Sequence, residues 1–148
     1  MAAGRSPRSR SSARRGLDGD RRSESRERAM MVLYEACTKG VSGDDIAAAQ
    51  VTEPDPTTAL LVHGVDQHRE QLDEAIAAQA RGWTLARMPL IDLTIMRIAG
   101  FELLARPEVP VAVVIDEAVE LAKRFSTDDS GRFVNGVLSA LVPVLRAA

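Results

Sequence analysis

Residues 89–105 are apolar around nearly the whole circumference of a helix, and this feature constrains the fold more than any other in the chain. A helix that is apolar on every side has no face that suits water, so this segment should lie at the centre of the fold. Pro89 fits the start of the helix, and the sequence RPEVP after Ala105 should end it. The apolar residues are Leu90, Ile91, Leu93, Ile95, Met96, Ile98, Phe101, Leu103 and Leu104.

Apolar residues recur at helical spacing in most of the remaining chain, which predicts an all-α fold. Gly40 should stop the first helix, and Asp55 followed by Pro56 should start the long third one. Pro143 should kink or end the last helix. The expected helices cover about residues 23–39, 42–50, 56–81, 89–105, 110–125 and 130–145, with one short turn after Trp83.

The stretch VPVAVVI at residues 109–115 fits a second interpretation, because β-branched runs also form buried strands. The continuation DEAVELAKRF has helical periodicity, and Pro110 suits a first helical turn. We therefore predict one helix over residues 110–125.

Charge is distributed unevenly along the chain. Residues 1–28 hold nine arginines and four acids, whereas residues 29–148 hold ten basic and seventeen acidic residues. Residues 1–20 have no periodic apolar pattern, so we expect a disordered Arg/Ser-rich arm before a folded domain of residues 21–148. A basic arm can attract a polyanion, but the composition alone favours a purely solvated tail.

The sequence offers no constellation of catalytic or metal-binding residues. His63 and His68 are five residues apart and cannot share a helix face, and the single cysteine, Cys37, lies on an apolar face. Phosphate-cradling glycine motifs are absent. We expect no enzyme activity, no metal and no cofactor. One cysteine and the lack of an apolar run near ~18 residues indicate a cytoplasmic protein without a membrane span.

Two groups of residues remain as candidates for binding. The first is the arginine cluster Arg21, Arg22, Arg26 and Arg28, where Arg22 and Arg26 share a helix face and could bind phosphate. The second is the start of the last helix, where Arg132 lies beside Phe133, a combination that suits unpaired nucleic acid. For each group a purely structural role is also open: ion pairs with Glu24 and Glu27 for the first, and core packing of Phe133 for the second.

The segment EAVELAKRFSTDDSGRFVNGVLSAL, residues 117–141, resembles the C-terminal signature of the NusB family. RRSESRERAMMVLYE resembles the opening helix of that family, and IDLTIMRIAGFELL resembles its central helix. The likeness covers residues 21–145. It implies a compact all-α fold of two small helical subdomains, about residues 21–82 and 83–148.

The resemblance also implies a function. NusB-like proteins are bacterial transcription antitermination factors that bind a single-stranded RNA element of ribosomal RNA operons, boxA, together with the ribosomal protein NusE in an RNA polymerase antitermination complex. Carried over by position, the implied RNA-binding residues are Arg21, Arg22, Arg26, Tyr34, Asp129, Arg132 and Phe133. The implied protein-partner residues are Asp92, Arg97 and Glu102.

Three points stay open at the level of sequence. A helical protein–protein adaptor without RNA binding is the alternative function. The same fold occurs as an RNA-binding module of ribosomal RNA methyltransferases. This chain has no βαβ cofactor-binding region, so it would correspond only to that module, detached from the enzyme. A monomer and a homodimer both fit the sequence.

Overall fold

The computed structural model describes residues 9–146, which form α-helices joined by short loops, with no strand in this range. The helices are α1 (Ser9–Lys39), α2 (Gly43–Ala48), α3 (Pro56–Gln79), α4 (Leu90–Ala105), α5 (Val111–Phe125) and α6 (Ser130–Leu145), with a 3-10 turn, η2 (Leu85–Arg87). The predicted all-α fold is confirmed.

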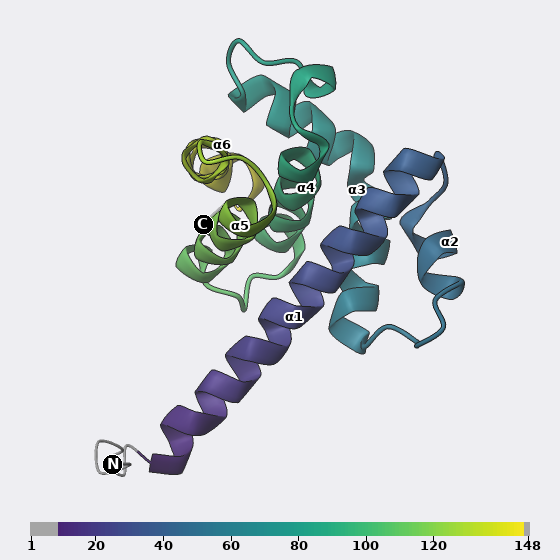
Figure 1. Cartoon of the computed structure of the whole chain (residues 1–148). Helices are drawn as coiled ribbons and strands as arrows, with labels where there is room; N and C mark the ends of the chain where they lie inside the picture. The colour runs from purple at the N-terminus through teal and green to yellow at the C-terminus, as the bar shows by residue number, and fades with distance from the viewer. Residues whose placement is uncertain (1–8, 147–148) are drawn as a thin grey trace.

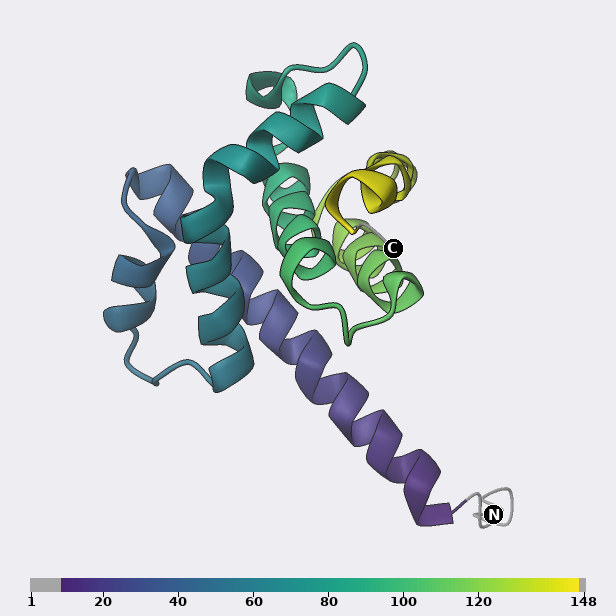
Figure 2. The ribbon, with the colours of Figure 1, turned by 180° about the vertical axis from the view of Figure 1, so that it is seen from behind.

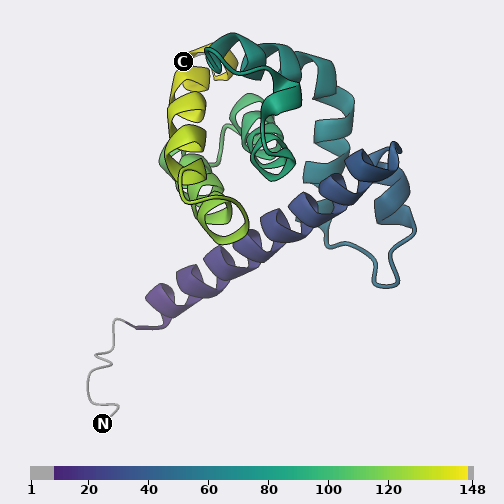
Figure 3. The same ribbon diagram turned by 45° about the horizontal axis from the view of Figure 1, so that its top comes forward.

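The α4 helix lies in the middle of the molecule, as its all-round apolar sequence predicted. It contacts α1, α3, α5 and α6, and Figure 3 shows it enclosed by its neighbours. Every residue from Asp92 to Leu103 is buried. Burying one large apolar side chain fully stabilises a fold by about 1.5–3 kcal/mol, so α4 contributes much of the core.

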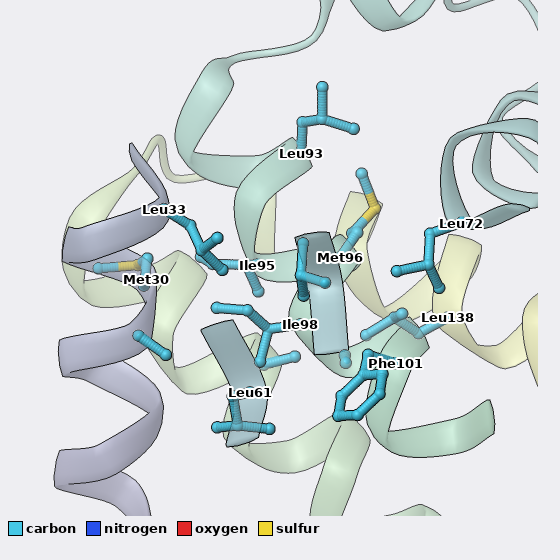
Figure 4. Packing of buried hydrophobic residues seen from close by; sticks show 14 of the residues in the cluster. Met30, Leu33, Leu61, Leu72, Leu93, Ile95, Met96, Ile98, Phe101 and Leu138 are labelled. Carbon is cyan, nitrogen blue, oxygen red and sulfur yellow. The ribbon is translucent and has the colours of Figure 1, made fainter. Parts of the chain in front are cut away.

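Side chains from four other helices close around α4. Figure 4 shows α1 and α3 side chains converging on those of α4, with Leu138 of α6 nearby. The labelled residues are Met30, Leu33, Leu61, Leu72, Leu93, Ile95, Met96, Ile98, Phe101 and Leu138.

The helix α1 begins earlier than expected, and α6 continues past its proline. Residues 9–20, which we expected to lack regular structure, continue α1 as a helix, and Figures 1 and 2 show this end extending away from the other helices. Residues 1–8 of the expected arm lie outside the described residues. Pro143 does not end α6, which continues to Leu145. Pro143 is on the exposed side, where water can satisfy the carbonyl that proline leaves free.

The predicted helix over residues 110–125 is confirmed as α5, and the strand alternative is not adopted. Its buried residues Val114, Ala118, Leu121 and Ala122 follow helical spacing toward α4 and α6. Val114 of the β-branched run belongs to this inward stripe, so the run begins a helix rather than a strand.

The start of α3 depends on a carboxylate that bridges two helices. Asp55 caps α3: its Oδ1 accepts a hydrogen bond from the Thr58 backbone N–H at 3.0 Å and another from the Ser25 hydroxyl of α1 at 2.8 Å. The Thr58 hydroxyl also donates to Asp55 Oδ2, at 2.7 Å. Burial alone would raise the pKa of Asp55, but these hydrogen bonds favour the charged form and hold the pKa below its usual 3.8.

This lowered pKa predicts an acid-sensitive contribution to stability. The folded state keeps Asp55 ionised at a lower pH than the unfolded state does, so the stabilisation is full above about pH 4 and disappears as the pH falls through the folded pKa. Asp55→Asn should therefore be less stable than wild type near neutral pH, and the difference should shrink below about pH 4. Urea unfolding across this range measures it. Parallel stability curves for the two proteins would contradict the prediction.

Candidate nucleic-acid interface

The start of α6 presents an aromatic side chain between two elements. Phe133 is half-buried and its ring lies 5.8 Å from that of Trp83, with the two planes tilted by 58°. Trp83 comes from the loop before η2 and is 50% exposed. Tilted rings at this separation attract each other, which holds Phe133 against the loop that carries Trp83.

Positively charged residues occur on the elements that meet here: η2, the end of α5 and the start of α6. Arg132 follows the α6 start and is exposed, and Arg87 from η2 lines the same pocket as Trp83 and Phe133. Lys123 at the end of α5 lies against the first turn of α6, because a Cβ added to Gly131 would be 3.2 Å from its Cγ. We call this set the α6-start surface; its members are Trp83, Arg87, Lys123, Arg124, Asp129, Arg132 and Phe133.

Arg124 connects the α6-start surface to α1. Its guanidinium lies 4.8 Å from the centre of the Phe125 ring and pairs with Glu27 of α1 at 2.9 Å. Met31 and Tyr34 follow Glu27 at helical spacing and are 46% and 37% exposed. Tyr34 is therefore on an open face of α1 that borders the end of α5.

The arginine cluster of α1 does not form one face for an anion. Arg26 is 3% exposed and binds Glu102 of α4 through two hydrogen bonds, from Nε to Oε2 at 2.8 Å and from Nη2 to Oε1 at 2.9 Å. The expectation that Arg26 meets RNA phosphate is wrong for this structure, because its donors face the interior. Burial acts to lower the pKa of Arg26, but the hydrogen bonds and charge of Glu102, with Glu117 nearby, outweigh this and raise it.

The other arginines of the cluster lie on a different side of α1. Arg22 is exposed and lines a hollow of about 390 Å³ together with Arg28 and the α3 cap Asp55. The Arg28 guanidinium donates to the carbonyls of Thr52 and Glu53 in the loop before α3. The side chain of Arg21 lies outside the described part of the structure. Arg22 thus remains a prediction as an RNA contact.

The three residues predicted to meet a protein partner are buried, at 2% exposure for Asp92, 6% for Arg97 and 1% for Glu102. Arg97 of α4 binds Asp73 of α3 at 2.7 and 3.0 Å. Glu102 binds Arg26 and, at 3.2 Å, Arg106. Arg97 and Glu102 hold helices together, so the expectation that they form an accessible partner surface is wrong.

Asp92 differs from those two because it lines a pocket. The Asp92 Oδ2 accepts a hydrogen bond from the buried Ser130 hydroxyl at 2.8 Å, which joins α4 to the start of α6. The pocket has a volume of about 390 Å³, and Trp83, Arg87, Asp129 and Phe133 also line it. Trp83 and Arg87 were not among the predicted site residues; a lone tryptophan in a polar turn was the only signal of them in the sequence.

Residues 9–146 were also compared with what a metal site and a membrane span require. Within this range no group of three or more His, Cys, Asp or Glu side chains is placed to hold a metal ion. None of the described helices is both long enough and apolar enough to cross a bilayer.

Comparison with known proteins agrees with the arrangement of helices. The chain is 46% identical over 129 residues to the transcription antitermination protein NusB of Saccharopolyspora erythraea, covering 83% of this chain and 87% of that protein. A crystal structure of T. maritima NusB superimposes with a TM-score of 0.76 at 27% identity, over 86% of this chain and 93% of that one.

A further solved structure, the antitermination factors NusB and NusE in complex with dsRNA, matches with a TM-score of 0.68 at 23% identity, over 83% of this chain and 96% of that one. At this identity the likeness concerns the fold alone. The model of the NusB family matches residues 23–143, which include the α6-start surface and most of every described helix after α1. Together with the 46% identical relative, this match shows that the chain belongs to the NusB family of transcription antitermination proteins.

Proposed function

We propose that this chain binds boxA-like single-stranded RNA of ribosomal RNA operons together with the ribosomal protein NusE, without catalysing a reaction. In this role it joins the RNA polymerase antitermination complex in the cytoplasm. Family membership supports the antitermination role, and a NusB–NusE complex with dsRNA is among its structural neighbours.

The observation that carries the proposal is the composition of the α6-start surface. Unpaired bases expose aromatic faces and are held by stacking on side chains, whereas their phosphates attract cations. The half-exposed Trp83 adjoins Phe133, and Arg87 lines the same pocket as these two aromatic residues. Arg132 in the first turn of α6 and Lys123 and Arg124 at the end of α5 add exposed positive charges to the surface. Asp129 is also part of this surface, with the exposed Asp128 directly before it. Carboxylates are acceptors, so both suit a sugar hydroxyl better than a phosphate.

The burial of Arg26 leaves fewer residues of α1 that can contact RNA. Since Arg26 is buried with Glu102, the cations that we assign to phosphate are those of the α6-start surface. Tyr34 extends the surface along α1, and Arg22 would contact RNA only on the side of α1 that faces the α3 start.

The test is fluorescence anisotropy with boxA-like RNA and a scrambled RNA of equal length, with and without NusE, over a series of salt concentrations. Wild type should prefer the boxA-like RNA, and its affinity should fall with salt. Arg132→Gln should lower the slope of log K against log salt by about 0.7, the value for one phosphate contact on a single strand.

Lys39→Gln is the matched control, because it removes one positive charge from an exposed residue at the far end of α1, where Lys39 pairs with Glu35. Its slope should equal that of wild type. Binding of NusE without any affinity for RNA would favour the adaptor alternative. An unchanged salt slope in Arg132→Gln would show that Arg132 does not contact an RNA phosphate.

A further inference from the structure

A side chain from the C-terminal end of α6 binds the end of α4 and the loop that follows it. The Arg146 guanidinium donates to the backbone carbonyls of Glu102 at 2.7 Å and Leu103 at 2.9 Å, in the last turn of α4. It also donates to the carbonyls of Arg106 at 2.8 Å and Val109 at 2.6 Å, in the loop between α4 and α5. One side chain therefore joins the end of α6 to both α4 and this loop.

Two prolines explain why these carbonyls need a donor from another helix. The residues four positions after Leu103 and Arg106 are Pro107 and Pro110, and proline has no N–H to donate. Arg146 supplies the donor for Leu103 and adds to the one loop N–H that reaches Arg106. The C-terminal end of a helix also carries partial negative charge, which a guanidinium stabilises.

The last turn of α6 has few contacts besides these bonds. Pro143 lies inside the helix and has no N–H for the carbonyl four residues before it. Pro143 and Val144 are exposed, and of residues 143–146 only Leu145 is a buried apolar residue. Leu145 lies on α4, since a Cβ added to Gly100 would be 3.5 Å from its Cδ1. A segment with few buried contacts opens at a lower free energy than the core does.

We infer that residues 143–146 form a latch, a segment that opens while the rest of the chain stays folded, and that Arg146 holds this latch closed on α4. When the latch opens, water replaces the guanidinium at the four carbonyls, and the α4 surface beside Gly100 is uncovered. The α6-start surface is at the opposite end of the same helix, about 24 Å away for 16 residues at ~1.5 Å each. The opening is therefore separate from the proposed RNA binding.

Arg26 shows how an arginine of the cooperative core differs from Arg146. Arg26 is 3% exposed and binds the buried carboxylate of Glu102, which would be left without this partner if Arg26 moved out. Arg146 is half-buried, and its four hydrogen bonds go to backbone carbonyls at the end of a helix, where water can take its place. Opening at Arg146 therefore costs less free energy than opening at Arg26.

The test is native-state hydrogen exchange of the full chain, followed amide by amide by NMR at low urea concentrations. In wild type the Val144 and Leu145 amides should exchange at rates that hardly change with urea, because local opening exposes little surface. The Leu138 amide, in the buried part of α6, should exchange more slowly, and its rate should rise steeply with urea. If all three rates depend equally on urea, residues 143–146 open only with the whole fold, and the inference is wrong.

Arg146→Gln tests the role of the guanidinium. The Val144 and Leu145 amides should exchange about tenfold faster than in wild type, the value of one hydrogen bond to a charged group. Arg146→Lys keeps the charge but has no planar fork to reach several carbonyls, so its effect should be intermediate. Lys39→Gln is the matched control, because it removes an exposed positive charge from α1 and should leave both rates unchanged.

Gly64→Ala gives the reverse comparison, because it acts on the contact of α3 with Phe101 and leaves the latch as it is. It should speed exchange at Leu138 by destabilising the whole fold, while the Val144 and Leu145 rates stay within about twofold of wild type. Equal acceleration at all three amides would overturn the inference.

The remaining outcomes concern Arg146 itself. Unchanged exchange at Val144 and Leu145 in Arg146→Gln would show that the guanidinium does not hold the segment closed. Failure of this variant to fold would show that Arg146 belongs to the cooperative core, and either result overturns the inference. Folded Arg146→Gln should bind boxA-like RNA as wild type does, and a loss of affinity would contradict the separation of the latch from the α6-start surface.

Discussion

Glu102→Leu should destabilise this protein by about 3–5 kcal/mol, as expected when one partner of a buried ion pair is removed. Glu102 is 1% exposed and Arg26 is 3% exposed, so the substitution leaves a guanidinium in the interior without its carboxylate. The pair also holds α1 on α4, and Glu117 of α5 lies 3.9 Å from Arg26. Urea unfolding at neutral pH measures the loss.

A double variant distinguishes the lost pair from lost packing. Arg26→Met combined with Glu102→Leu replaces both charges by apolar groups and should recover most of the stability. Glu35→Gln, in the exposed Glu35–Lys39 pair, should cost only about 0.3–0.5 kcal/mol. A loss below about 1 kcal/mol in Glu102→Leu, or no recovery in the double variant, would contradict a structural role for Arg26.

Gly64→Ala should destabilise the fold by about 1–3 kcal/mol, although alanine is the better helix former by about 1 kcal/mol. Gly64 lies in α3 against the edge of the Phe101 ring of α4, and a Cβ there would be 2.1 Å from Phe101 Cζ. Phe101 is buried at 4% exposure, and the His68 ring of α3 lies 5.6 Å from its ring. The helices α3 and α4 would have to move apart.

Gly136→Ala provides the matched control in α6, because a Cβ at that position meets no atom within 4 Å. It should stabilise the protein by about 0.5–1 kcal/mol through helix propensity alone. Thermal or urea unfolding of the two variants should therefore change in opposite directions. Stabilisation in both would show that Phe101 does not constrain the approach of α3 to α4.

Local sequence patterns predicted the helices well, because where a helix begins, ends and faces the core depends on residues that are close in sequence. The all-round apolar run of residues 90–104 placed α4 at the centre, and the cap at Asp55 with Pro56 marked the start of α3. The one alternative, a strand near Val113, was decided by the helical residues after it.

The functional surface was predicted less completely because it depends on pairs distant in sequence. Arg22 and Arg26 are four residues apart and were expected on one face, but Arg26 meets Glu102, 76 residues away. Nothing in the local pattern of α1 reveals that partner. In the same way, Trp83 and Phe133 are distant in sequence and come into contact only when the chain folds. The sequence therefore indicated the start of α6 as a binding surface but not the loop with Trp83 that adjoins it.

The most direct test of the account is the affinity of Phe133→Ala for boxA-like RNA in the presence of NusE, measured with its melting temperature. Because Phe133 is half-buried, some stability should be lost, and binding is compared at a temperature where both proteins are folded. The account predicts that affinity falls about tenfold, within the ~1–3 kcal/mol of one stacked base, while Val144→Ala, at an exposed site of α6, binds as wild type. An affinity equal to that of wild type in folded Phe133→Ala would contradict the assignment of RNA binding to the α6-start surface.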